Sequence, residues 1–179
     1  MKWEMDRHKW TDLGEGGIAL SERIMEFISA RDPDRVRELF FLIEEAVVPV
    51  NGPMRVGAEA VSACLVQGLL SATPSSRREI LYLLFQLAGG VVDTPDSNLV
   101  HGVRRELELG FPIYGQIAEV GTSDERLQCI DLLSLCARFN KPCLDRATSL
   151  MRRIAEVGDR EASTVSVELE DLRRDGYIP

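Results

Sequence analysis

The residue in this sequence whose type and neighbours best suit catalysis is His101. Arg104 and Arg105 follow it by about one helical turn, and Asp96 lies just before it. A histidine with arginines and a carboxylate nearby has the groups that acid–base catalysis uses. The surrounding pattern predicts a helix, however, and a single histidine on a helix is most often a surface residue. We therefore expect His101 to be exposed and assign it no catalytic role.

The cysteines raise the question of a metal site. Zinc sites need Cys and His residues that cluster at short, regular spacings. No C-x-x-C pair occurs, and each cysteine lies in an apolar stretch, so we expect buried free thiols in a reducing compartment. The residues considered are Cys64, Cys129, Cys136 and Cys143, together with His8 and His101.

Other catalytic signatures are absent from the sequence. It contains no H-E-x-x-H, no phosphate-binding loop, no G-x-S-x-G and no dinucleotide fingerprint. No strand precedes the glycine-rich run 14–17, so we expect a loop there. The adjacent acids Glu44–Glu45 and Glu170–Asp171 would point about 100° apart on a helix, so they should face solvent separately. The sequence predicts no enzyme, no cofactor and no metal site.

Composition and charge favour a folded protein with a protein partner. The 179 residues are 45% hydrophobic and 28% charged, with only 6% aromatic residues, and the net charge is −8. An acidic surface repels phosphate backbones, which disfavours general nucleic-acid binding and favours a basic protein partner. The stretch Met1–Trp10 does not look like a secretory signal, and no apolar run is long enough for a membrane span. We expect a cytoplasmic protein.

Helix signals dominate the chain and no strand pattern competes with them. Asp32-Pro33, Thr73-Pro74 and Ser123-Asp124 are helix starts, because Asp, Thr and Ser cap free amides and proline fits the first turn. Gly89-Gly90 should end one helix, and Gly110–Pro112 should interrupt another. Loops are expected at 48–53 and 91–97. The predicted helices are 33–47, 57–70, 74–88, 99–120 with its interruption, 123–136, 141–157 and 160–174.

Three of these helices share a template. Pro33 and the segment from Arg37 to Ile43 match Pro74 and the segment from Arg78 to Leu84, 41 residues later. Thr73 and its helix match Thr122 and its helix at a shift of 49, and a weaker echo at a shift of 48 pairs Arg104 with Arg152. Periods of about 40 to 47 residues with two helices per unit are typical of HEAT and armadillo arrays.

Several stretches then resemble bacterial HEAT-like proteins. They are Trp10 with Leu13, Gly14 and Ile18, the phrase 29–32 (SARD), the stretch 76–90 (SRREILYLLFQLAGG) and the run 103–114 (VRRELELGFPIY). The resemblance implies an all-α fold, a short α-solenoid of stacked antiparallel helix pairs. Some proteins of this kind are encoded beside polymorphic toxins and act as immunity proteins, which implies a cognate toxin domain as partner. We expect one domain over 1–179, with an N-terminal segment 1–16 and a C-terminal capping helix and tail 160–179.

In such a solenoid the second helix of each pair lines the usual binding face. If the template helices are these second helices, the positions that do not face the core form a strip of acids and aromatics. Aromatic rings supply contact area and carboxylates pair with Lys or Arg of a basic partner. The same rings could instead pack between repeats, with the acids as a solvated face. The predicted partner-binding residues are Glu38, Phe41, Glu45, Glu79, Tyr82, Gln86 and Asp131.

Two other functions stay open on the same resemblance. One is a HEAT-like scaffold or maturation factor for another protein, for instance a tetrapyrrole-binding one. The other is a HEAT-like DNA glycosylase, which needs a basic groove and an acid beside Trp3 or Trp10. Stacked repeats could collect the chain's arginine pairs into a basic ridge, although the net charge of −8 argues against it. The pairs are Arg77–Arg78, Arg104–Arg105, Arg152–Arg153 and Arg173–Arg174.

Overall fold

The protein is all-helical over the residues that the structure describes. A computed structural model describes residues 2–13, 16–49, 52–94 and 97–179. These stretches contain ten α-helices and one short 3-10 helix and no strand. The elements are α1 (Lys2–Arg7), η1 (Trp10–Leu13), α2 (Gly16–Ser29), α3 (Pro33–Val47), α4 (Ala58–Gly68), α5 (Pro74–Asp93), α6 (Asn98–Leu109), α7 (Phe111–Val120), α8 (Ser123–Cys136), α9 (Lys141–Ala155) and α10 (Asp159–Arg174).

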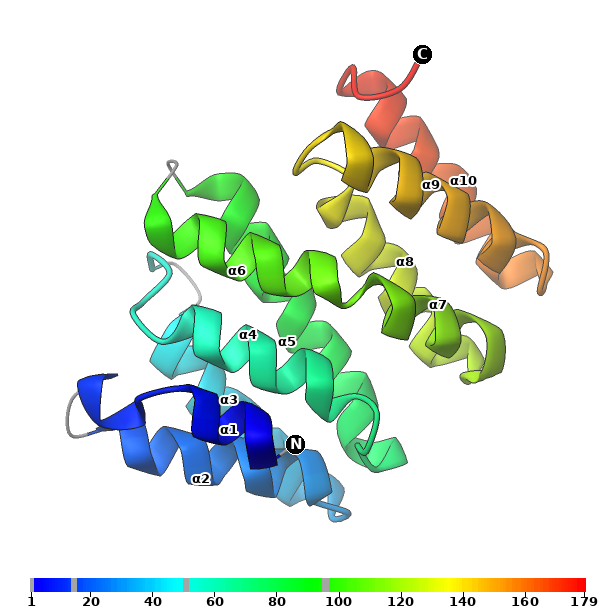
Figure 1. The fold of residues 1–179 in the computed structure, drawn as a ribbon. Helices are drawn as coiled ribbons and strands as arrows, with labels where there is room; N and C mark the ends of the chain where they lie inside the picture. Colours follow the sequence, from blue (N-terminus) through cyan, green and yellow to red (C-terminus); the bar gives the residue numbers. More distant parts are fainter. Residues whose placement is uncertain (1, 14–15, 50–51, 95–96) are drawn as a thin grey trace.

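The helices form two layers of packed pairs that follow one another in chain order. Contacts join α2 to α3, α4 to α5, α7 to α8 and α9 to α10. In Figure 1 the first members of these pairs lie in front and the second members, α3, α5, α8 and α10, lie behind. Within this rear layer, α5 contacts both α3 and α8, and α8 contacts α10. The two termini lie at opposite ends of the stack (Figure 1).

Most of the predicted helices are confirmed to within a few residues. The predicted interruption at Gly110–Pro112 separates α6 from α7, with Pro112 in the first turn of α7, where its missing N–H costs no hydrogen bond. Asp32 and Thr73 cap α3 and α5 as expected. The third cap is Thr122 rather than Ser123: its side chain accepts from the Glu125 amide and Glu125 bonds back, a full capping box.

Two glycine-based predictions are wrong. The helix expected to stop at Gly89-Gly90 continues to Asp93, because Gly90 admits close packing rather than ending the helix. A Cβ at Gly90 would lie 2.8 Å from the Met54 methyl carbon, and Val91 beyond it is buried. In the predicted loop 14–17, Gly14 and Glu15 lie outside the described residues, but Gly16 and Gly17 begin α2. A Cβ at Gly17 would overlap the Trp10 carbonyl, so glycine lets η1 and α2 meet.

The N-terminal segment 1–16 contains α1 and η1, which the sequence analysis did not predict, and α2 was missed as well. Leu20, Ile24, Phe27 and Ile28 of α2 are buried, at the spacing of one helical face. Trp10 is buried and donates from its ring N–H to the Met5 carbonyl over 2.8 Å. This segment therefore belongs to the same continuous core as the rest of the chain.

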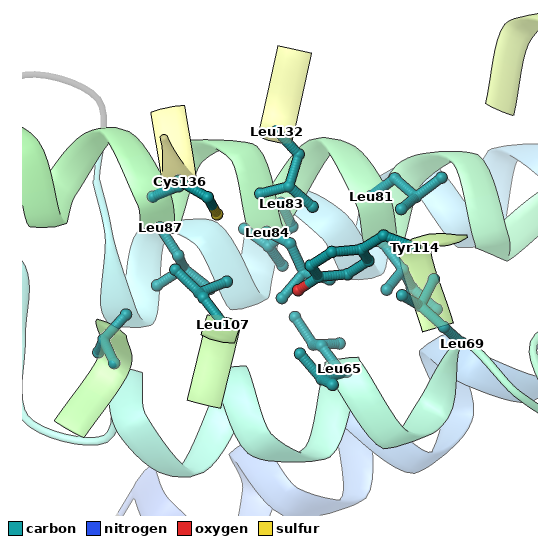
Figure 2. Packing of buried hydrophobic residues seen from close by; sticks show 14 of the residues in the cluster. Leu65, Leu69, Leu81, Leu83, Leu84, Leu87, Leu107, Tyr114, Leu132 and Cys136 are labelled. Carbon is teal, nitrogen blue, oxygen red and sulfur yellow. The ribbon is translucent and has the colours of Figure 1, made fainter. Parts of the chain in front are cut away.

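The centre of the core is built from leucines around one tyrosine. Figure 2 shows the Tyr114 ring among Leu65, Leu69, Leu81 and Leu84 of α4, α5 and the turn between them. Tyr114 is fully buried, and its hydroxyl finds no hydrogen-bond partner in the described part of the chain. An unsatisfied buried hydroxyl is destabilising. Burial also raises the pKa of this phenol well above its ordinary value.

Two Arg–Glu pairs with buried carboxylates join the starts of α5, α8 and α10 in the rear layer. Arg77 of α5 lies 3.1 Å from Glu125 of α8, and Arg126 of α8 lies 3.0 Å from Glu161 of α10. Both carboxylates are buried, and each arginine also donates to the carbonyl just before its own helix cap, Ala72 or Gly121. The same device therefore links α5 to α8 and α8 to α10. Hydrogen bonding to Arg126 is the main reason that the pKa of Glu161 is lowered.

We expect Arg126→Ala to lower the free energy of unfolding by about 2 kcal/mol at pH 7, because it leaves Glu161 buried without its cation. The pKa of Glu161 is lowered in the folded chain, so the stability from this pair is present above the ordinary value of 4.5 and lost as the pH falls further. Urea unfolding of both proteins from pH 7 to pH 3 should show the difference shrinking below pH 4.5. Arg152→Ala, at an exposed position on α9, is the control. An equal loss in both variants would contradict the role of the pair.

Tyr114→Phe should raise the free energy of unfolding by about 1 kcal/mol, because it removes an unsatisfied hydroxyl and keeps the ring. Urea unfolding at neutral pH checks the sign. A loss of stability would mean that the hydroxyl makes a hydrogen bond, for example to a buried water molecule.

Candidate partner-binding surface

The seven predicted partner-binding residues lie on three neighbouring helices of the rear layer. Three of them, Glu38, Phe41 and Glu45, are exposed on α3. Three more lie on α5, where Tyr82 is exposed and Glu79 and Gln86 are half-buried. Asp131 is half-buried on α8. We call these seven residues the acidic–aromatic strip. The template positions that the sequence assigned to the core, such as Leu39, Ile43 and Leu84, are fully buried.

A row of aromatic rings connects α3 to α5 at the middle of the strip. Phe40 stacks on Tyr82 with ring centroids 5.6 Å apart, and Tyr82 stacks on Phe85 at 5.9 Å. Phe41 meets Phe40 edge to face at 5.4 Å. Tyr82 therefore packs between helices, whereas Phe41 keeps 56% of its surface exposed. Gln86 joins this group by donating to the Tyr82 hydroxyl over 3.0 Å.

The acids of the strip fall into two kinds. Glu38 and Glu45 are in exposed ion pairs, at 2.6 Å to Arg35 and 3.2 Å to Arg55. Such surface pairs contribute little stability and exchange easily. Glu79 and Asp131 make no ion pair with any residue that the structure describes. These two carboxylates are the ones left for a cation from outside the chain.

The surroundings of Asp131 disfavour its charged form. Burial between its neighbours raises its pKa, and the nearby carboxylate of Glu168 on α10 raises it further. Glu168 is half-buried and likewise has no ion pair within the described stretches. No sequence pattern points to Glu168, because only the packing of α10 on α8 brings it beside Asp131. A partner's lysine or arginine placed here would relieve the repulsion between the two acids.

The strip continues into a hollow at the C-terminal end of α5. The hollow has a volume of about 590 Å³, and its walls come from α5 and from residues after α3. It is lined by Val48, Pro49, Gly52, Pro53, Met54, Gln86, Gly89, Gly90, Asp93 and Thr94. A Cβ at Gly89 would lie 3.8 Å from Leu135, one turn beyond Asp131 on α8, so the exposed stripes of α5 and α8 adjoin here.

The prediction that both acids of the Glu44–Glu45 pair face solvent is wrong for Glu44. Glu44 was expected to face solvent with Glu45, but it is buried with 7% of its surface exposed. Burial raises its pKa, and the neighbouring Glu45 raises it further. The buried face of α3 is therefore wider than its apolar residues alone indicated. It includes Glu44, which is covered together with Phe40 and Val47.

The remaining candidates for chemistry are dispersed. His101 is exposed on α6 as predicted, with its Nδ1 3.0 Å from an Arg104 guanidinium nitrogen. The four cysteines are free and buried as predicted, and burial raises the pKa of the Cys64 thiol to about 12, which makes it a poor nucleophile. Across the described stretches, no three of the His, Cys, Asp and Glu residues come close enough to hold a metal ion.

Most of the arginines in the four pairs are in ion pairs with acids of the chain. Arg105 pairs with Glu59 and Glu106, Arg153 with Glu119, and Arg173 with Glu170. These cations lie on α6, α9 and α10 and are neutralised there, whereas Arg78 and Arg152 are exposed and make no ion pair with the residues that the structure describes. Trp10 is part of the core, and Trp3 is exposed on α1 in the front layer.

No protein-family model matches the chain, and no curated protein matches it. No helix among the described residues has both the length and the apolar character that crossing a bilayer requires.

Asp131→Asn should raise the free energy of unfolding at pH 7. The folded chain holds the pKa of Asp131 above its ordinary value of 3.8, so the charged form costs stability as the pH rises through that interval. The gain should therefore shrink as the pH falls and vanish near pH 3.8. Thermal or urea unfolding across this range measures it. Asp34→Asn, at an exposed position in the first turn of α3, is the control, and a destabilised Asp131→Asn at neutral pH would contradict the account.

Proposed function

We propose that this chain is a HEAT-like helical repeat protein that binds a basic protein segment along the acidic–aromatic strip. On this proposal the biological role is that of an immunity protein, which neutralises a cognate toxin by binding it. The protein acts by contact alone, without a cofactor or a catalytic residue.

The repeat assignment is supported by equivalent residues in successive pairs. The template helices α3, α5 and α8 are the second members of three neighbouring pairs. Thr73 and Thr122 cap two of them, and Arg77 and Arg126 occupy the same place in each and make the same kind of ion pair. A stack of such units gives one continuous face made of second helices.

The binding assignment is carried by Phe41. Its ring is more than half exposed, it is held edge to face against Phe40, and acids lie on both sides of it along α3. A rigid exposed aromatic is the kind of residue that contributes most to protein interfaces. Glu79, Asp131 and a net charge of −8 supply attraction for a basic partner.

A scaffold or maturation factor would use the same face, so the partner's identity separates the two roles. The tagged protein is recovered from its own host, and the proteins retained with it are identified by mass spectrometry. The immunity role predicts a basic toxin domain in stoichiometric amount, and its expression should be tolerated only together with this chain. A retained partner that is harmless when expressed alone would favour the scaffold role.

Phe41→Ala should weaken binding of the retained partner by about 2 kcal/mol, or roughly thirtyfold in Kd. Glu79→Lys should weaken it as well, and the loss should be greatest at low salt, because attraction becomes repulsion. Leu109→Ala, at a residue 58% exposed on α6 in the front layer, is the matched control. Calorimetry gives the affinities, and thermal unfolding checks that each variant is folded. Unchanged binding in both strip variants would rule out this face.

A further inference from the structure

A second surface lies on the opposite layer, between α7 and α9. These two helices are side by side in Figure 1 and contact each other. Two hollows of about 610 Å³ and 200 Å³ lie between them and share Gly115, Glu119, Leu150 and Arg153 in their walls. The two hollows together form one elongated depression, which we call the α7–α9 trough. Nothing in the proposed partner-binding strip uses it.

The floor of the trough is kept open by a glycine. A Cβ at Gly115 would lie 3.3 Å from the Leu150 side chain, so any larger residue would fill the space between α7 and α9. Leu150 therefore forms an apolar floor along the middle of the trough. The end away from Arg146 is lined by Ala118, Ile154 and Val157, with the carboxylate of Glu156 beside them.

The other end carries a fixed cation. The guanidinium carbon of Arg146 lies 4.8 Å from the centre of the buried Phe111 ring, in a cation–π contact. The contact with the ring holds the guanidinium at this end of the trough, and its N–H groups donate to no residue that the structure describes. An arginine held in this way loses little freedom when it forms a two-point contact with a carboxylate.

The charges of the trough leave this arginine uncompensated. Glu119 is paired with Arg153 at 2.6 Å, and Asp145 with Lys141 at 2.8 Å. Arg146 has no carboxylate partner among the residues described here. Arg146 at one end and the apolar floor next to it make that part of the trough complementary to a segment with one acid followed by apolar side chains, and Glu156 disfavours a second acid at the far end.

We propose that the α7–α9 trough binds a short acidic peptide segment, whose Asp or Glu carboxylate pairs with Arg146 and whose apolar side chains lie on Leu150, Ile154 and Val157. A polyanion such as RNA fits less well, because Glu119, Asp145 and Glu156 line the trough and would repel successive phosphates. This site is distinct from the strip in its layer, its charge and its ligand. It holds whether or not the strip binds a basic protein.

The test starts from random dodecapeptides displayed on phage and selected on the intact folded protein. The strongest peptide is synthesised, and its Kd is measured by fluorescence anisotropy with the wild type and with variants. Arg146→Gln should weaken binding by more than about tenfold, and Arg146→Lys by less, because the charge stays while the planar two-point contact is lost. Ser149→Trp, which places a ring on the trough wall at an exposed position, should also block binding.

Arg152→Gln is the matched control, since it removes the same charge from an exposed position on α9 that does not line the trough. It should leave the Kd unchanged within about twofold, because an exposed charge outside the contact contributes little. The proposal is overturned if no peptide is enriched, if the enriched peptides lack Asp and Glu, or if Arg146→Gln and Arg152→Gln behave alike. It is also overturned if a single-stranded oligonucleotide competes for the trough better than the peptide.

Discussion

The arrangement of α5, α8 and α10 in the rear layer depends on the two Arg–Glu pairs at the starts of these helices. In α5 and α8 the arginine is the fourth residue of the helix, and in α8 and α10 the glutamate is the third. Because each pair fixes one helix start against the next, residues equally far along these helices come to similar heights. Tyr82 and Asp131 are both the ninth residue of their helices, and Phe41 is the ninth of α3. This register aligns the α5 and α8 parts of the strip, whereas α3 meets α5 at the stacked rings of Phe40 and Tyr82.

The strip keeps side chains that folding alone would not favour. Phe41 exposes an apolar ring to water, and Asp131 faces Glu168 without a cation although both are half-buried. Groups of this kind cost stability in the free protein and become favourable when a complementary surface covers them. Glu38 and Glu45 differ, because Arg35 and Arg55 already neutralise them. The binding energy should therefore come mainly from the centre of the strip and from its α5–α8 side.

Local sequence signals predicted the helices well where a cap and an apolar period agreed. Thr73-Pro74 with Leu84, and Pro112 after Gly110, are examples in which the backbone rules alone decide the outcome. At Gly17 and Gly90 the glycines predicted a loop or a helix end, and both predictions are wrong. Only the fold shows that Trp10 packs against Gly17 and Met54 against Gly90. The template alignment identified Phe41 and Tyr82 as surface positions. It could not show that Phe40 and Phe85 stack with Tyr82, or that Glu168 lies beside Asp131, since those contacts join different helices.

Hydrogen–deuterium exchange of the chain, with and without the partner it retains, is the most direct test of where that partner binds. The account predicts slowed exchange in the second half of α3, in α5 from about Arg78 onward and in α8 around Asp131. It predicts no change in α6, α7 and α9 when the partner is basic. Protection confined to the front layer, with α3 and α5 exchanging as in the free protein, would contradict the acidic–aromatic strip as the binding surface.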